Sequence, residues 1–389
     1  MHDLSKVNVR YDISHKGNDM DRGWSWVIMF ASFSTNALAA MIVYGAGMIH
    51  VALLQQFEKD VAFTSLIGSV FNSLTSISAP IASILITAGS CRMSHIVGGA
   101  CCFIGFSSSF FINSLNGLLW TYGVLAGSGI CLCLTPSVVI LSFYFDKYRG
   151  IATGFATAGA GAGVLVCGPL INYFFDHYGV NGTFLILGGL SAHFFVIAAL
   201  MKPSKAEIRN KRQKRINENK KTRKSGLSFI GNICQLQILK SKTFICILIA
   251  NFLWFTSFAA TLLHLPIFSV EKGFSNADAA ILLTFIGLGS TINRLLTGLA
   301  IGPNGIDPLL LFMGCLGITG LLTIFFPFYA GVYYGQCLFA LTFGMYSGSL
   351  MSLQPLIAFH IAGIKYVSSA VGMLFLIGGI GFLLGPPLA

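Results

Sequence analysis

The sequence is dominated by long apolar stretches that contain almost no charged residues. A helix of about 20 residues crosses a hydrocarbon core roughly 30 Å thick, and these stretches have that scale. Polar turns such as Gly302-Pro303-Asn304-Gly305 separate them. We therefore expect about eleven transmembrane helices, over residues 24–56, 63–89, 93–113, 117–143, 151–175, 182–201, 243–269, 279–300, 308–326, 329–360 and 366–389.

The composition argues against a water-soluble enzyme. Hydrophobic residues make up 55% of the 389 residues, charged residues make up only 10%, and the mean hydropathy is +0.78. A soluble chain of this length needs more charge to cover its surface. The sequence thus predicts an all-α polytopic membrane protein. None of the ten cysteines falls in the spacing of a metal site or a disulfide framework, so we expect no metal and no other cofactor.

The net charge of +11 is concentrated in one segment. Residues 202–242 contain 13 Lys or Arg against Glu207 and Glu218, which gives this segment alone a net charge of +11. A nucleic-acid-binding surface would interleave such charge with folded structure and aromatic side chains, and this segment does not. We interpret it as a basic loop beside anionic lipid rather than a nucleic-acid site.

The distribution of Lys and Arg predicts the orientation in the membrane. If the N-terminus is inside, 21 of the 24 basic residues are cytoplasmic. The turns on the outside contain only Lys59 and Lys272, and Arg294 lies within an expected helix. We therefore place the N-terminal tail, 1–23, and the basic loop, 202–242, in the cytoplasm.

The order of the segments resembles the 6 + 6 helix plan of major facilitator transporters. Residues 24–201 form an expected half of six helices, 202–242 form the basic loop, and 243–389 form a second half with five helices. The helix number does not fit a seven-helix receptor, and no segment resembles the selectivity filter of a channel. Because the plan needs a twelfth helix, we expect the chain to be truncated; a natural odd-numbered protein is the alternative.

Two motifs resemble those of the monocarboxylate transporter family within the major facilitator superfamily. Residues 21–26 are similar to an entry motif of an acidic residue, glycines and two tryptophans, although Arg22 and Ser25 replace two of its glycines. Residues 144–159 are similar to its second motif, an aromatic pair and basic residues followed by alternating Ala and Gly. Gly89–Arg92 and Gly378–Ala389 are similar to two further family segments. The motif residues that we single out are Asp21, Gly23, Trp24, Trp26, Asp146, Lys147, Arg149, Gly154 and Gly159.

The resemblance assigns a substrate site around Arg294. An arginine within a membrane helix is costly unless it has a partner, so it usually has a function; in the family it is thought to hold the substrate carboxylate. Ser290 and Tyr44 occupy the positions of two titratable residues of the proton-coupled branch, and neither titrates near neutral pH. Asn293 is a candidate for lining the cavity. The alternatives for Arg294 are a structural ion pair or a side chain that extends from the helix end to the membrane interface, and the alternative for Asn293 is a helix-bridging role.

The second motif has two interpretations. Asp146, Lys147 and Arg149 either set the topology or form a salt bridge that closes the cytoplasmic side. Gly154 and Gly159 belong to a run of small residues that either packs helices or acts as a pivot. The two tryptophans are expected to anchor the first helix at the membrane interface.

These observations predict a carrier of small monocarboxylates or related organic solutes that works by alternating access. The competing hypothesis is a sensor or scaffold that uses a carrier fold without transport. The expected partners are a small organic anion, the lipid bilayer, protons if another residue carries them, and the single-span ancillary subunit that several family members use. The plasma membrane is the expected location.

Overall fold

The computed structural model describes residues 20–57, 61–205, 207–209, 211, 239, 241–301 and 305–388. All regular secondary structure in these ranges is helical. Most of the basic loop, 202–242, and most of the N-terminal tail lie outside the described residues. Eight helical stretches in the described ranges are long and apolar enough to cross a membrane.

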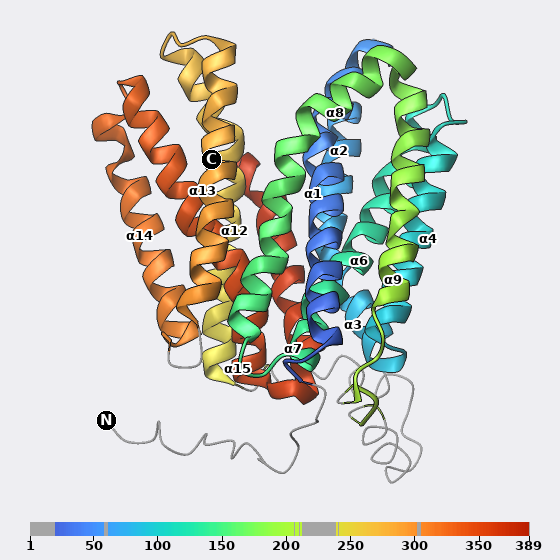
Figure 1. Ribbon diagram of the computed structural model, residues 1–389. Coiled ribbons are helices and arrows are strands. Elements are labelled where there is room, and N and C mark those ends of the chain that lie inside the picture. Colours follow the sequence, from blue (N-terminus) through green and yellow to red (C-terminus); the bar gives the residue numbers. More distant parts are fainter. Residues whose placement is uncertain are drawn as a thin grey trace.

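The helices form two groups (Figure 1). The first group contains α1 (Trp24–Phe57), α2 (Val61–Ile77), α3 (Ala79–Ala88), α4 (Cys91–Ser109), α5 (Leu115–Leu118), η2 (Leu119–Ala126), α6 (Gly127–Val139), α7 (Leu141–Tyr144), α8 (Arg149–Ser191) and α9 (His193–Leu200). The second group contains α12 (Lys242–Glu271), α13 (Asn276–Ala300), α14 (Pro308–Tyr329) and α15 (Tyr333–Leu388). We call these groups the first half and the second half.

Two helices reverse direction at a glycine. Gly179 within α8 has φ 64° and ψ −174°, and Gly363 within α15 has φ 64° and ψ 176°. This backbone region is essentially restricted to glycine. Each glycine therefore divides a double-length helix into two crossings, so the eight apolar stretches give ten crossings. With α4, which is 19 residues long, the described residues contain the eleven helices that the hydropathy pattern predicts.

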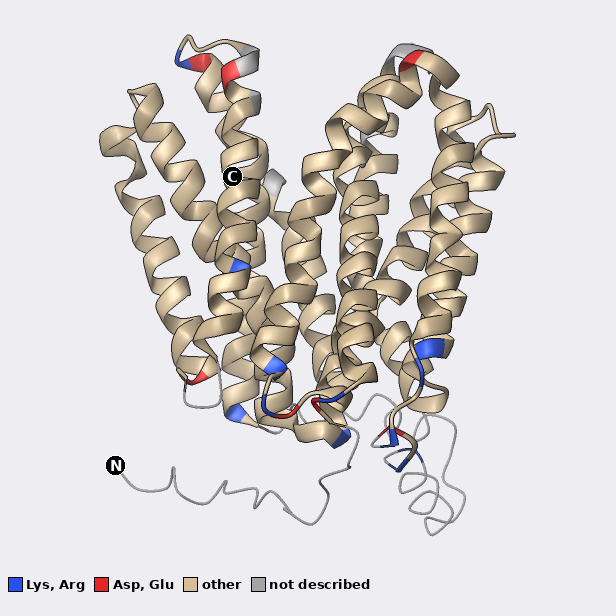
Figure 2. Ribbon diagram, viewed as in Figure 1, with Lys and Arg blue, Asp and Glu red and all other residues tan. Residues whose placement is uncertain are grey.

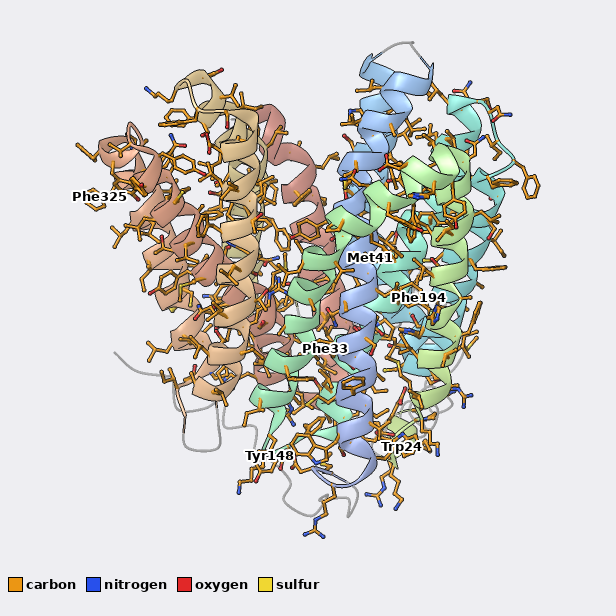
Figure 3. The ribbon with its side chains drawn as sticks, turned by 45° about the horizontal axis from the view of Figure 1, so that its top comes forward. Trp24, Phe33, Met41, Tyr148, Phe194 and Phe325 are labelled. Carbon is orange, nitrogen blue, oxygen red and sulfur yellow. The ribbon has the colours of Figure 1, made fainter. Side chains whose placement is uncertain are left out.

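The two ends of the bundle differ in charge. Figure 2 shows that Lys and Arg gather at one end, where α1, α8 and α12 begin and where α15 turns at Gly363. We call this end the basic end. In Figure 3 Trp24 and Tyr148 lie at this end, whereas Phe325 points outwards from α14 near the other end. Phe328 on the same helix is 83% exposed, as expected for a side chain that faces lipid.

The two halves contact each other mainly through two pairs of elements. The beginning of α8 packs against the end of α13, and α2 and α3 pack against the second crossing of α15. Both contacts lie toward the basic end, and the ribbons of the two halves diverge toward the opposite end (Figure 1). The conformation is therefore closed at the basic end.

Candidate functional site

Arg294 lies on α13, six residues before the helix ends at Ala300, or about 9 Å from that end. Its Nε donates a hydrogen bond to Ser290 Oγ at 3.2 Å, one turn earlier on the same helix. Its Nη1 donates to the carbonyl oxygen of Thr157 at 2.7 Å. Thr157 lies on α8, so this bond joins the two halves. Nη2 has no hydrogen-bond partner among the described residues.

Tyr44 approaches the same site from α1. It interacts electrostatically with Arg294, and its side chain is 47% exposed. In the described part of the chain, Tyr44 is the ionisable group that the structure places near Arg294, and no carboxylate pairs with the guanidinium there. Of the four candidate substrate residues, Ser290 thus contacts Arg294 directly and Tyr44 interacts with it electrostatically.

Asn293 has a different environment. Its Nδ2 donates to Met345 O at 2.9 Å and to Ser349 Oγ, both on α15. Thr297, one turn later, also donates to Ser349 Oγ, at 2.9 Å. The Asn293 side chain therefore holds two helices of the second half together, which is the alternative that the sequence left open.

A second polar contact between the halves lies next to Arg294. The hydroxyls of Thr157 on α8 and Ser352 on α15 are 2.7 Å apart, and both side chains are buried. Sequence reasoning did not single out either residue, because an isolated Thr or Ser in an apolar helix usually bonds to its own helix. Thr157 does this as well, since its hydroxyl is 2.9 Å from Thr153 O.

Gly154 and Gly159 face different neighbours. A Cβ atom at Gly154 would lie 2.6 Å from Arg294 O and 2.7 Å from Gly298 Cα, both on α13. A Cβ atom at Gly159 would lie 2.3 Å from Phe33 O on α1. Gly154 thus lies where the two halves touch, and Gly159 lets two helices of the first half approach closely.

The two family motifs, which are far apart in sequence, form one structural unit at the basic end. The Asp21 carboxylate accepts hydrogen bonds from the backbone N–H groups of Asp146, Lys147 and Tyr148 at 3.0–3.3 Å. The Trp26 ring packs edge-on against Phe145 with 5.6 Å between ring centroids. The acidic residue of the first motif therefore holds the turn of the second motif in place.

The tryptophans do more than anchor the helix at an interface. Trp26 supports the loop before α8, as described above, and Trp24 donates from its indole Nε1 to Leu200 O at 3.0 Å. Lys202 Nζ lies 4.0 Å from the centroid of the Trp24 ring. Trp24 and Trp26 are 39% and 42% exposed, so each also presents part of its ring to the surroundings. Gly23, just before them, has φ 49°, which explains the glycine of this motif.

Asp146, Lys147 and Arg149 were the candidates for a salt bridge that closes the cytoplasmic side. They form a local ion pair and an aromatic contact across the halves. Asp146 Oδ1, in the loop before α8, and Nη2 of Arg149, the first residue of α8, are 3.6 Å apart. The Arg149 guanidinium carbon lies 3.4 Å from the centroid of the Phe359 ring on α15. Lys147 Nζ lies 5.3 Å from the ring of neighbouring Tyr148. Arg149 thus contacts the second half through a cation–π interaction.

A buried carboxylate lies outside the membrane-spanning helices, just after α9. Glu207 is 6% exposed, and its Oε1 accepts a hydrogen bond from the backbone N–H of Cys91 at 2.7 Å. Burial raises the pKa of the Glu207 carboxyl, and its hydrogen bonds from Cys91 and Ser204 together with the Lys211 charge oppose this shift. Lys211 Nζ donates to Gly89 O at 2.9 Å. This segment therefore fastens the turn between α3 and α4.

No group of three His, Cys, Asp or Glu side chains in the described ranges could hold a metal ion. Around Arg294, the site offers a fixed cation beside a hydroxyl group.

Residues 26–386 match the family model of the Major Facilitator Superfamily. The chain belongs to the major facilitator superfamily.

The comparisons agree with this assignment. Monocarboxylate transporter 12 of Xenopus laevis is 27% identical over 384 residues, which cover 95% of this chain and 82% of the relative. Monocarboxylate transporter 2 of Mesocricetus auratus is 28% identical, and the match covers 95% of this chain and 78% of the relative. Monocarboxylate transporter 4 of Mus musculus is 27% identical, with 94% and 77% covered. Its relatives thus include monocarboxylate transporters, and this chain is a transmembrane transporter of the superfamily.

Two solved structures have the same fold. The proton:xylose symporter XylE bound to 6-bromo-6-deoxy-D-glucose has a TM-score of 0.70 at 14% identity, and the match covers 94% of this chain and 89% of XylE. The E. coli fucose:proton symporter FucP (N162A) has a TM-score of 0.70 at 16% identity, with 94% and 91% covered. These matches extend over both halves of the chain.

Proposed function

We propose that this transporter carries small organic anions with a carboxylate group and that Arg294 binds the carboxylate. The observation that supports this proposal is the guanidinium without a carboxylate partner among the described residues. An unpaired arginine at membrane depth costs about 2.5–3.5 kcal/mol or more. A bound carboxylate offsets this cost through charge-assisted hydrogen bonds. The names of the relatives support the same substrate class.

We also propose that the basic end faces the cytoplasm, because Lys and Arg gather there. The described conformation is then closed toward the cytoplasm and open toward the outside. Alternating access requires this contact to open while the opposite end closes. The plasma membrane fits this orientation, and the association with a single-span ancillary subunit remains an expectation from the family.

This proposal does not include proton coupling through the two titratable positions of the proton-coupled branch, which Ser290 and Tyr44 occupy here. Ser290 accepts a hydrogen bond from Arg294, and Tyr44 interacts electrostatically with the guanidinium, but neither side chain can cycle a proton near neutral pH. Transport is then facilitated diffusion or exchange unless another residue carries the proton.

The test is uptake of labelled short-chain carboxylates into proteoliposomes that contain the full chain. Saturable uptake that unlabelled carboxylates inhibit, and uncharged analogues such as the corresponding amides do not, supports the proposal. Equal inhibition by carboxylates and amides contradicts it, because a guanidinium site distinguishes the two.

A further inference from the structure

The cation that the proposed function assigns to the substrate also holds the two halves together. Arg294 Nη1 donates across the boundary to Thr157 O at 2.7 Å, at the level where α8 and α13 touch through glycine. A Cβ atom at Gly161, one turn after Thr157, would collide with the Thr291 side chain of α13. The two helices therefore cannot separate here without breaking the bond between Arg294 and Thr157.

Thr157 makes a second contact with the other half through its hydroxyl. The Thr157 hydroxyl has one proton, and Thr153 O at 2.9 Å is an available acceptor for it. Ser352 then donates its own proton to Thr157 Oγ1 at 2.7 Å. One residue of the first half thus bonds to α13 through its carbonyl and to α15 through its side chain. Both bonds are shielded, since Thr157 and Ser352 are 5% and 1% exposed.

A carboxylate and the Thr157 carbonyl compete for the same guanidinium. A guanidinium can bind a carboxylate with two parallel hydrogen bonds along either of two edges, Nη1 with Nη2 or Nε with Nη2. Both edges include Nη2, the nitrogen that has no partner among the described residues. Nη1 bonds to Thr157 and Nε bonds to Ser290. Nη1 has two protons, so a carboxylate takes one of them beside the proton that Thr157 O accepts. The charged acceptor forms the stronger bond and draws the guanidinium toward itself, which weakens the bond to Thr157. Such a ligand binds better when the halves have separated at the cytoplasmic end, and this difference in affinity shifts the conformational equilibrium.

We propose that Thr157 and Ser352 are positioning residues that couple substrate binding at Arg294 to the opening of the cytoplasmic side. This inference rests on the proposed function, because it needs a carboxylate at Arg294. The bonds of Thr157 to Arg294 and Ser352 stabilise the outward-open state, and the substrate weakens the first of them. Binding of the substrate is thereby linked to release of the inner closure.

The test measures the inner closure at a different place, between α3 and α15. Thr87 Oγ1 and Ser368 Oγ are 3.3 Å apart across the halves, so the double variant Thr87→Cys/Ser368→Cys forms a disulfide when this side is closed. The chain without these two substitutions controls for the native cysteines. Addition of a transported carboxylate slows disulfide formation if substrate binding releases the closure. An unchanged or faster rate with a saturating carboxylate overturns the coupling.

Variants of the two positioning residues provide the second arm. Thr157→Val and Ser352→Ala remove the buried hydrogen bond between the halves, which favours separation of the halves by about 2- to 12-fold. The external half-saturation concentration of the carboxylate rises by a similar factor, whereas the internal one does not rise. Thr157→Ser keeps the hydroxyl and restores wild-type values. A purely structural role lowers the maximal rate without this asymmetry, and that result contradicts the proposal.

Arg294→Ala separates the two levels of inference. If Arg294→Ala loses carboxylate transport while Thr157→Val changes neither half-saturation concentration, Arg294 binds substrate but the coupling through Thr157 is wrong. If Arg294→Ala transports carboxylates with unchanged half-saturation, the proposed function itself fails.

Discussion

Gly154→Ala places a methyl group where the two halves touch. The new Cβ atom would lie 2.6 Å from Arg294 O and 2.7 Å from Gly298 Cα. Both are backbone atoms, so they cannot move aside as a flexible side chain would. Ordinary contact begins at 3.4 Å, and the closest contact would be 2.6 Å, so α8 and α13 must separate by about 0.8 Å. This movement would stretch the 2.7 Å bond between Arg294 and Thr157 to the limit of a hydrogen bond.

The expected effect is a shift toward the inward-open state. Overpacking of this kind costs about 1–3 kcal/mol, which corresponds to a shift of about 5- to 150-fold in the equilibrium. The assay is the rate of disulfide formation in the Thr87→Cys/Ser368→Cys background, with and without Gly154→Ala. Gly168→Ala on the same helix is the matched control, because its Cβ would meet nothing within 4 Å.

Gly154→Ala should slow this disulfide formation at least fivefold, and Gly168→Ala should leave it unchanged. Equal rates in the two variants, with both proteins inserted and folded, refute the reasoning that this glycine contact keeps the cytoplasmic side closed.

Three further results are expected. Asp21→Ala removes the acceptor of three backbone N–H groups, so it should lower the melting temperature in detergent and increase proteolysis near residue 147. Asp21→Glu should lose less stability, and equal stability of the wild type and both variants would show that these bonds are unimportant. Glu207→Gln keeps the acceptor for Cys91 but removes a buried charge. Because the folded-state pKa of Glu207 is raised, the wild type loses stability as pH rises through that pKa. The variant should therefore have a higher melting temperature than the wild type at pH 8, and this difference should narrow toward pH 5; a difference that widens on acidification would contradict the sign of the pKa shift. Because Ser290 and Tyr44 do not titrate near neutral pH, an imposed proton gradient should change carboxylate uptake only weakly; a several-fold acceleration by external acid that a protonophore abolishes would show that another residue carries protons.

The sequence predicted the helices well because each crossing needs an apolar segment of nearly fixed length. Hydropathy does not encode where a continuous helix reverses. Gly179 and Gly363 are two among 44 glycines, and they stand out only in the structure, because each has a positive φ within a continuous helix.

The candidate site was predicted only in part. Arg294 was predictable because charge is rare within membrane helices, and Tyr44 and Ser290 followed from the family resemblance. Thr157 and Ser352 were missed because their importance comes from a pairing 195 residues apart in sequence. Asp21 was recognised as a motif residue, but its role depends on N–H groups near residue 147, which a sequence motif does not reveal.

Carboxylate transport by Arg294 variants tests the central claim most directly. Arg294→Ala and Arg294→Lys are compared with the wild type in proteoliposomes at equal amounts of inserted protein. Loss of charge-assisted bonds of about 1.5–3 kcal/mol should raise the half-saturation concentration by roughly 10- to 150-fold in Arg294→Ala. Arg294→Lys keeps the charge but loses the planar fork, and it should be impaired to a lesser degree. An inserted Arg294→Ala protein that transports carboxylates with unchanged half-saturation would contradict the account.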